Sequence, residues 1–134
     1  MEAIAIELFC TLISQCNTAF LSQKNLSNSK TITAFLSYII EHYNKILLDE
    51  FSVHSGYSKT HICRLFKQHL GKSFLDVVTE LRINYAKSYL TNTDMLVKDI
   101  CFEVGYDSIE YFQRLFKRET GYTPGEYRNL SKKA

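Results

Sequence analysis

Apolar residues recur at helical spacing along the chain, and each periodic stretch predicts one amphipathic helix. From Thr31 to Tyr43 they stand at i, i+3, i+4, i+7, i+8 and i+11, the spacing of a helix with one buried face. A short helix is predicted at Leu48–Ser55, and a third between the cap residue Ser58 and Gly71. Because the chain contains only five Gly and one Pro, the periodicity predicts an all-α fold.

The second half repeats these elements after one longer helix. Ser73 and Asp76 predict a capping box for a helix that runs to about Leu90 and is ended by residues 91–93. Its expected buried seam is Phe74, Val77, Val78, Leu81, Tyr85 and Tyr89. Further helices are predicted at Val97–Glu103, after the cap residue Ser108, and from the capping box at 123–126 through Tyr127. Lys132 and Lys133 are expected to form a frayed basic tail.

An internal repeat relates the two halves. GYSKTHICRLFKQHLGKS at Gly56–Ser73 returns as GYDSIEYFQRLFKRETGYT at Gly105–Thr123. The tetrapeptide RLFK is repeated at an offset of 50, whereas Gly56 and Gly105 are 49 apart, so the second copy gained one residue near its helix start. Each copy places two short helices around a Gly-containing turn, which predicts a helix-turn-helix. A motif built twice presents two similar surfaces to a repetitive partner, and double-stranded DNA is such a partner.

The predicted organisation is an N-terminal helix and linker at 1–29, followed by a domain at 30–134. Within that domain we expect a first helix-turn-helix subdomain at about 31–72, a connecting helix at about 73–91 and a second subdomain at about 92–130. Residues 3–21 favour a helix with a wide apolar surface, and Ser22–Ser29 is polar and typical of a linker. The N-terminal helix either folds back on the domain, or mediates a homodimer or ends a missing upstream domain.

Composition narrows the function without deciding it. The chain has 134 residues, of which 46% are hydrophobic and 22% charged, as in an ordinary soluble globule. The net charge of +2 is too small to indicate a polyanion partner, but residues 58–69 carry Lys59, Arg64 and Lys67 and no acid. The four Cys form no CxxC pair, and the four His are scattered, so we expect reduced thiols and predict no metal, cofactor or catalytic site.

No targeting signal or membrane span is predicted. Glu2 and Glu7 stand where a secretory signal would carry Lys or Arg, and no apolar run is long enough to cross a bilayer. We therefore expect a cytoplasmic, nucleoid-associated protein.

The outward faces of the two predicted recognition helices carry side chains suited to DNA. Arg64 and Arg114 occupy the same repeat position, and each can bond guanine O6 and N7. Gln113 suits adenine, Glu110 suits the cytosine amine, and Thr60 and Ile109 suit thymine methyls. Phosphate contacts are expected from Lys59, Lys67, Lys72 and Lys117, and from the helix N-termini at Ser73 and Thr123.

The connecting helix has a length that suits a duplex. Eighteen residues from Ser73 to Leu90 span roughly 27 Å at ~1.5 Å per residue. With the subdomain bodies added, the recognition helices would lie about 34 Å apart, one turn of B-DNA, and enter successive major grooves. Because the two outward faces differ, we expect an asymmetric target rather than a palindrome. Arg82, beside the seam, is expected to form a structural ion pair.

These residues resemble the DNA-binding domain of the AraC/XylS family of bacterial transcription regulators over about Ile32 to Arg128. The resemblance rests on Gly56-Tyr57-Ser58, Arg64-Leu65-Phe66-Lys67, Gly71-Lys72-Ser73, Leu81-Arg82-Ile83, Ile100, Val104-Gly105-Tyr106-Asp107, Phe112, Arg114, Phe116-Lys117, Gly121, Pro124 and Tyr127-Arg128. It implies a seven-helix fold whose third and sixth helices contact DNA bases. The implied base-contacting positions are Thr60, Cys63 and Arg64, and Ile109, Glu110, Gln113 and Arg114.

The chain departs from the family pattern at a few positions. Ser52 and Cys101 stand where the family usually has Ala, and both are small enough for the packing to survive. Thr60 replaces a frequent aromatic residue and Cys63 a polar one, which obscures the base preference of the first subdomain.

The resulting prediction is a sequence-specific DNA-binding transcription regulator, which we expect to be an activator and not an enzyme. No nucleophile–base pair or metal constellation supports catalysis. The alternative is a protein-interaction domain that binds RNA polymerase or another regulator without touching DNA. The acid-free outward face of residues 58–69 argues against that alternative.

Overall fold

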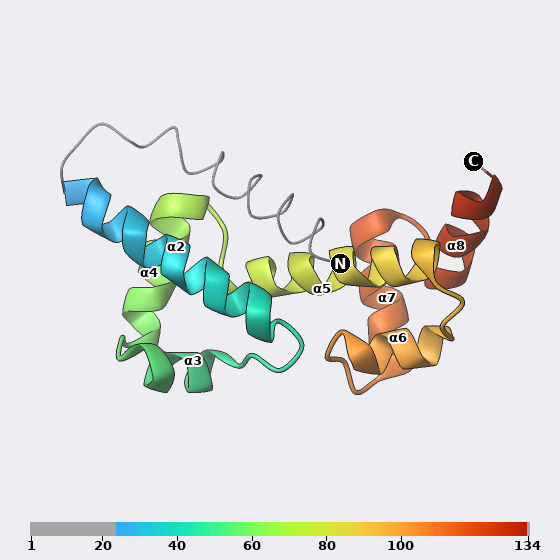
Figure 1. Ribbon diagram of the computed structural model, residues 1–134, viewed down its shortest axis with the longest axis horizontal. Coiled ribbons are helices and arrows are strands. Elements are labelled where there is room, and N and C mark those ends of the chain that lie inside the picture. Colours follow the sequence, from blue (N-terminus) through green and yellow to red (C-terminus); the bar gives the residue numbers. More distant parts are fainter. Residues whose placement is uncertain (1–23, 134) are drawn as a thin grey trace. The chain divides into compact units, whose positions relative to one another are not determined.

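The computed structural model describes residues 24–133, which fold into helices without any strand (Figure 1). The helices are α2 (Lys24–His42), α3 (Leu48–Ser55), α4 (Lys59–Leu70), α5 (Phe74–Asn92), α6 (Val97–Glu103), α7 (Ile109–Thr120) and α8 (Pro124–Lys133). This confirms the all-α prediction. The helix predicted at 3–21 lies outside the described residues. Among residues 24–133, no helix combines the length and apolar character that a membrane crossing requires.

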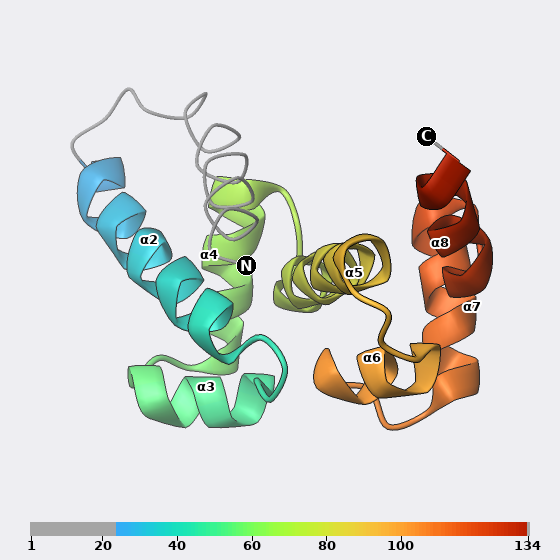
Figure 2. The ribbon, with the colours of Figure 1, turned by 45° about the vertical axis from the view of Figure 1, so that its right-hand side comes forward.

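The chain divides into two compact units, with the boundary inside α5 after Thr79. The first unit contains α2, α3, α4 and the beginning of α5, and Figure 2 shows α3 at the ends of α2 and α4. Its core forms around Phe51, whose ring lies 5.0 Å from Phe35 and 5.4 Å from Phe74 between centroids. The buried residues Ile62, Leu65 and Phe66 hold α4 on this core, as the sequence predicts.

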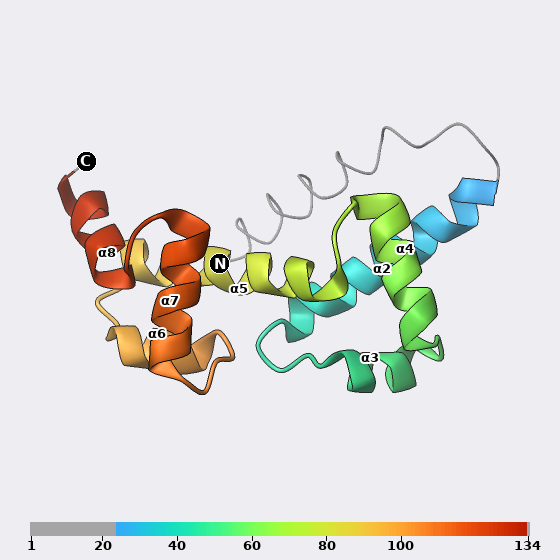
Figure 3. The ribbon, with the colours of Figure 1, turned by 180° about the vertical axis from the view of Figure 1, so that it is seen from behind.

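The second unit contains the rest of α5 together with α6, α7 and α8, and α7 packs against both α6 and α8 (Figure 3). Ile100 and Cys101 are buried on α6. Phe112, Leu115 and Phe116 are buried on α7 and repeat the core positions of α4 at an offset of 50. The six predicted seam residues of α5 are all buried, and Ile83, Ala86 and Leu90 are buried as well.

Local capping chemistry sets where α4 and α7 begin and end. Ser58 Oγ accepts a hydrogen bond from His61 N at 3.1 Å, and Ser108 Oγ accepts one from Tyr111 N at 3.2 Å. Both helices end at a glycine with a left-handed backbone, Gly71 (φ 67°) and Gly121 (φ 86°), a conformation that costs other residues more. The predicted caps are therefore confirmed.

Three helix boundaries differ from the prediction. Residues 24–29, predicted as linker, form the first turns of α2. Ser and Asn lower helix propensity by less than about 1 kcal/mol each, and Lys24–His42 contains no Gly or Pro to interrupt the helix. Helix α5 continues to Asn92, because the side chains of Thr91 and Asn92 bond back to Ser88 on the previous turn.

The third difference lies at the C-terminal end. Lys132 and Lys133, predicted as a frayed tail, form the last turn of α8. Cations at this end of a helix are stabilised by the helix dipole, and no residue after Gly125 interrupts the helix.

Candidate nucleic-acid interface

The face of α4 that points away from its core carries the predicted contact residues of the first unit. Thr60, Arg64 and Lys67 are exposed, and Cys63 is half-buried beside them. Spacings of three and four residues place these side chains on one helix face. The structure therefore brings together four of the predicted residues on one surface.

The corresponding face of α7 is more polar. Glu110, Gln113, Arg114 and Lys117 are exposed, and Ile109 is partly exposed. Glu110 Oε2 accepts a hydrogen bond from the hydroxyl of the cap residue Ser108 at 3.2 Å, so this carboxylate is engaged at the start of its own helix.

Two residues next to this face were not singled out by the sequence analysis. Tyr111 is 49% exposed, and together with Arg114, Leu115 and Arg118 it lines a shallow hollow of about 270 Å³. Arg118 Nη2 bonds Glu119 Oε1 at 3.0 Å. The internal repeat is the signal that could have identified Tyr111, because this residue aligns with His61 of the first copy at an offset of 50.

The lysines predicted to bind phosphate differ in their surroundings. Lys59 forms an ion pair with Asp49 of α3, so its charge is shared with a neighbouring acid. Lys67 and Lys117 are exposed in the last turns of α4 and α7. Lys72 follows α4 and is half-exposed. An exposed ion pair such as Lys59–Asp49 contributes little to stability. Lys59 therefore remains available to exchange Asp49 for a phosphate.

The two predicted helix N-termini carry carboxylates. Asp76 Oδ2 accepts a hydrogen bond from Ser73 N, and Glu126 Oε2 accepts one from Thr123 N at 2.9 Å, which confirms both capping boxes. Hydrogen bonds from Ser73, and to a lesser degree the charges of Lys67 and Lys72, hold the pKa of Asp76 below its usual value. A phosphate approaching Ser73 would meet this negative charge.

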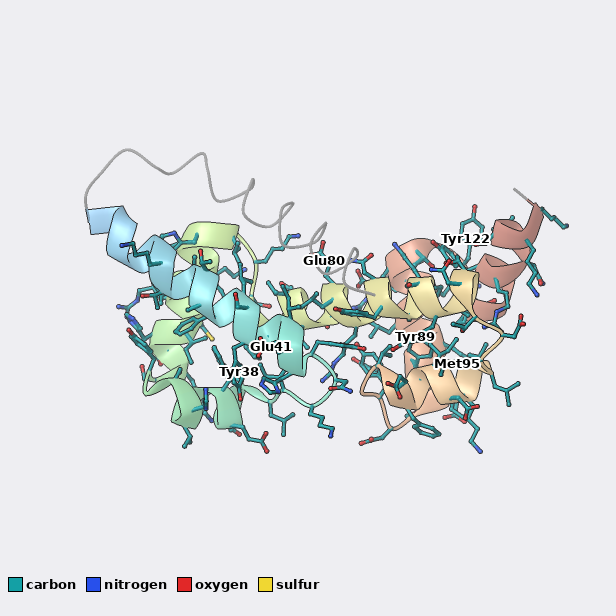
Figure 4. The ribbon with its side chains drawn as sticks, viewed as in Figure 1. Tyr38, Glu41, Glu80, Tyr89, Met95 and Tyr122 are labelled. Carbon is teal, nitrogen blue, oxygen red and sulfur yellow. The ribbon has the colours of Figure 1, made fainter. Side chains whose placement is uncertain are left out.

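The turn before α4 is packed against its own unit. The Tyr57 ring lies 5.4 Å from Phe35 of α2 and stacks on His61 of α4 at 5.0 Å. Nearby, Tyr38 of α2 stacks on His54 of α3 at 4.3 Å (Figure 4). These ring contacts fix α3 and α4 relative to α2.

In the second unit, two arginines fix the helices relative to one another. The Arg82 guanidinium lies 5.1 Å from the centre of the Tyr106 ring, which ties α5 to the turn before α7. Arg128 of α8 donates to three carbonyls, those of Leu90 (3.1 Å), Thr93 (3.3 Å) and Met95 (2.6 Å), at the end of α5 and in the segment that joins it to α6. The sequence alone predicts no such role for Arg128.

Other chemistry is limited in the described region. Cys63 and Cys101 are free thiols, and burial raises the pKa of the Cys101 thiol, with smaller contributions from Asp107 and Glu110. Within residues 24–133, no cluster of three or more His, Cys, Asp or Glu side chains could hold a metal ion.

Comparison with known proteins identifies the family of this arrangement. Residues 52–130 match the model of a helix-turn-helix domain family, and that range begins within α3 and ends within α8. The chain belongs to the AraC-type helix-turn-helix family. Members of this family are transcription regulators and not enzymes.

Individual relatives agree with this assignment. The chain is 31% identical over 128 residues to an HTH-type transcriptional regulator of Staphylococcus aureus, covering 95% of this chain but 17% of that protein. The C-terminal domain of the response regulator AraT from Geobacillus stearothermophilus is 31% identical, with a TM-score of 0.68 and coverage of 70% of this chain and 79% of that domain's solved chain. The DNA-binding domain of AdpA, solved with a target DNA, shares the fold at 21% identity and a TM-score of 0.67, covering 71% and 86% of the two chains.

Proposed function

We propose that this AraC-type chain is the DNA-recognition part of a transcription regulator and inserts α4 and α7 into successive major grooves of an asymmetric promoter site. The observation that supports this most is the placement of Arg64 and Arg114. Both are exposed at the same repeat position, each on a capped helix whose opposite face is buried. AdpA, a protein of the same fold, has been solved with a target DNA, which agrees with this use of the fold.

The base contacts follow from the side-chain chemistry. Arg64 and Arg114 are assigned to guanines, Gln113 to adenine, and Glu110, once released from Ser108, to a cytosine amine. Thr60, Cys63 and Ile109 supply small or apolar contacts. Lys67, Lys72 and Lys117, with Lys59 released from Asp49, neutralise phosphates and thereby set affinity and register.

The remaining functional proposals concern the regulator as a whole, because the chain spans 17% of the length of the first curated relatives that it matches. We propose an activator that recruits RNA polymerase, works in the cytoplasm on the nucleoid, and dimerises through residues 3–21 or an upstream domain. An inducing signal would then act on a part of the regulator outside the two units described above.

Selection of bound duplexes from a random library tests the proposal directly. We expect an asymmetric consensus with two conserved blocks, and loss of that consensus in an Arg64→Ala/Arg114→Ala variant. A Lys30→Ala/Lys45→Ala variant removes the same charge from exposed positions outside the recognition helices and should retain the consensus. Failure of the unmodified chain to enrich any duplex, with retention of RNA polymerase on the immobilised chain, would favour the protein-interaction alternative.

A further inference from the structure

A side chain from the same repeat position spans the helix-turn-helix turn in each unit. In the first unit, Ser52 Oγ donates to the Tyr57 carbonyl at 2.6 Å. In the second unit, Cys101 Sγ donates to the Tyr106 carbonyl at 3.6 Å. Both donor and acceptor are repeated at an offset of 49, so these are equivalent bonds. An Ala side chain at either position could not form this bond.

The two turns differ by one residue, and the difference lies directly after this bond. Tyr57 is followed at once by the cap residue Ser58, whereas Asp107 separates Tyr106 from the cap residue Ser108. The Cys101 thiol also lies 3.6 Å from the Ser108 carbonyl. The longer C–S bond and the larger sulfur atom give Cys101 a wider reach than a hydroxyl. The thiol thus contacts both ends of the inserted residue.

Supporting bonds close each turn in a different way. In the first unit, Ser55 Oγ accepts from Tyr57 N at 3.3 Å and donates to the Ser52 carbonyl at 3.4 Å. In the second unit, Tyr106 N donates directly to the Cys101 carbonyl at 3.0 Å, and Val104, which occupies the position of Ser55, is buried. The first turn, which also carries a backbone bond from Gly56 N to the Ser52 carbonyl at 3.1 Å, is thus closed with the help of two hydroxyls, and the second by a thiol and the backbone.

The thiol is suited to remain a donor. Cys101 has no exposed surface, and burial raises the pKa of its thiol, so the sulfur keeps its proton at neutral pH. The Ser52 bond, in contrast, lies in an exposed turn where water competes with it.

We propose that Ser52 and Cys101 are positioning residues, each matched to the length of its turn. They fix where α4 and α7 begin and hence the direction in which Arg64 and Arg114 leave their helices. This inference rests on the proposed function of α4 and α7 as recognition helices. Without the bond, the first turn of the helix gains freedom and base discrimination falls, although the helix itself persists.

The test uses the 134-residue chain with Ser52→Ala, Cys101→Ala and Cys101→Ser variants, the last also combined with removal of Asp107. Because Ser and Cys differ from Ala by a single side-chain atom, the Ala variants are expected to fold. Affinity is measured for the selected duplex and for duplexes with one base pair changed under either helix. Amide hydrogen exchange is followed at the starts of α4 and α7, and the denaturation midpoint is recorded for each variant.

We expect Ser52→Ala to lower discrimination under α4 alone, and Cys101→Ala under α7 alone, each by about threefold to tenfold, the range of one net hydrogen bond. Exchange at the affected helix start should rise by a similar factor. Cys101→Ser should behave like Cys101→Ala, because a hydroxyl oxygen sits on a shorter bond than sulfur and would not contact the carbonyls of both Tyr106 and Ser108, which lie on either side of the inserted Asp107. Removal of Asp107 should rescue Cys101→Ser by giving the second turn the length of the first.

Some outcomes would overturn the inference. If the variants lower affinity equally for every duplex while discrimination and amide exchange stay unchanged, the two side chains only stabilise the fold. If removal of Asp107 fails to rescue Cys101→Ser, the match to turn length is wrong. If the unmodified chain selects no DNA, the proposed function fails separately, and amide exchange at the two helix starts still decides whether the bonds position the helices.

Discussion

The two units share their buried positions and differ at several exposed ones, although the exposed Arg64 and Lys67 recur as Arg114 and Lys117. Ile62, Leu65 and Phe66 on α4 recur as Phe112, Leu115 and Phe116 on α7 at an offset of 50, and all six are buried. On the outward faces, Thr60 and Cys63 are replaced by Glu110 and Gln113. Packing constrains interior side chains closely, whereas exposed positions are free to follow the partner. The difference supports our proposal that one scaffold is used for two unlike half-sites.

The units also differ in how their helices are held. Three rings form the centre of the first unit: Phe51 meets Phe35 edge to face and stacks on Phe74. The second unit adds the Arg128 side chain, which bonds three backbone carbonyls. Apolar packing tolerates small displacements of a helix, whereas a planar guanidinium that donates several hydrogen bonds fixes the orientation of the groups that it joins. We therefore expect the two units to respond differently to mutation.

The largest effect should come from removing a core ring. Phe66→Ala and Phe116→Ala each delete a fully buried ring and should lower the free energy of unfolding by about 3–5 kcal/mol. Hydrogen exchange should show protection lost first in the unit that carries the substitution. Loss of protection in both units to the same extent would show that they unfold as one. Circular dichroism gives the midpoints, because the chain has no Trp for fluorescence.

The Arg128 bonds should matter in the second unit alone. Arg128→Ala leaves three carbonyls without their donor and should cost about 2–3 kcal/mol, the range for a charged hydrogen-bonded group. Lys132→Ala removes the same charge from an exposed position on the same helix and should cost much less. Denaturation curves check the pair. An equal effect of the two substitutions would mean that charge, not the bonding geometry, stabilises α8.

Substitution of either Arg64 or Arg114 should remove base preference at only one of the two blocks of the target. Arg64→Ala should cost about 1–3 kcal/mol at the specific site and relax one base pair, and Arg114→Ala should do the same at the other block. Competition assays with singly substituted duplexes measure this. Uniform weakening over all duplexes would reassign the arginine to a phosphate.

Phosphate contacts should appear in the salt dependence. Lys67→Ala should weaken binding to every duplex and reduce the slope of log K against log salt concentration by about one. Lys59→Ala should reduce the slope less, because Lys59 is paired with Asp49 in the free protein. Titrations at several salt concentrations compare the two. Identical slopes for Lys67→Ala and the unmodified chain would remove Lys67 from the interface.

The smallest expected effect is a pH dependence of the first unit. The pKa of Asp76 lies below its usual 3.8 in the folded chain, so its capping contribution is present above pH 3.8 and is lost as the pH falls through the lowered folded value. The stability difference between the unmodified chain and Asp76→Asn should therefore be constant at pH 5–7 and shrink below 3.8. A difference that persists to the lowest pH measured would assign the stabilisation to shape and not to charge.

Local signals predicted much of the fold. Ser58, Ser108, Gly71 and Gly121 mark helix ends through bonds within a few residues, and such bonds can be inferred from spacing. The boundary at residues 24–29 was wrong because polar composition resembles a linker, although nothing in Lys24–His42 breaks a helix. Periodicity identified the buried seam of α5, but not that Ile83, Ala86 and Leu90 are also buried.

Contacts between distant residues could not be inferred in the same way. The Lys59–Asp49 pair depends on how α3 meets α4. Arg128 reaches carbonyls more than thirty residues earlier. The resemblance predicted that Ser52 and Cys101 are small enough for the packing to survive. Their role as hydrogen-bond donors could not be predicted, because it depends on the path of the backbone through the turn. The exposure of the predicted contact residues on α4 and α7, in contrast, could be inferred from the sequence, because helical spacing alone separates them from the core.

The position of Arg128 near the end of the chain has a consequence for synthesis. Once Val78 has been synthesised, all core residues of the first unit are present. The second unit is complete only after Arg128, whose side chain bonds the Leu90 carbonyl at the end of α5. At about 5–20 residues per second, the ribosome needs several seconds for the intervening stretch. The first unit can therefore fold while the second is still being made, so two related sequences that could mispair emerge one after the other.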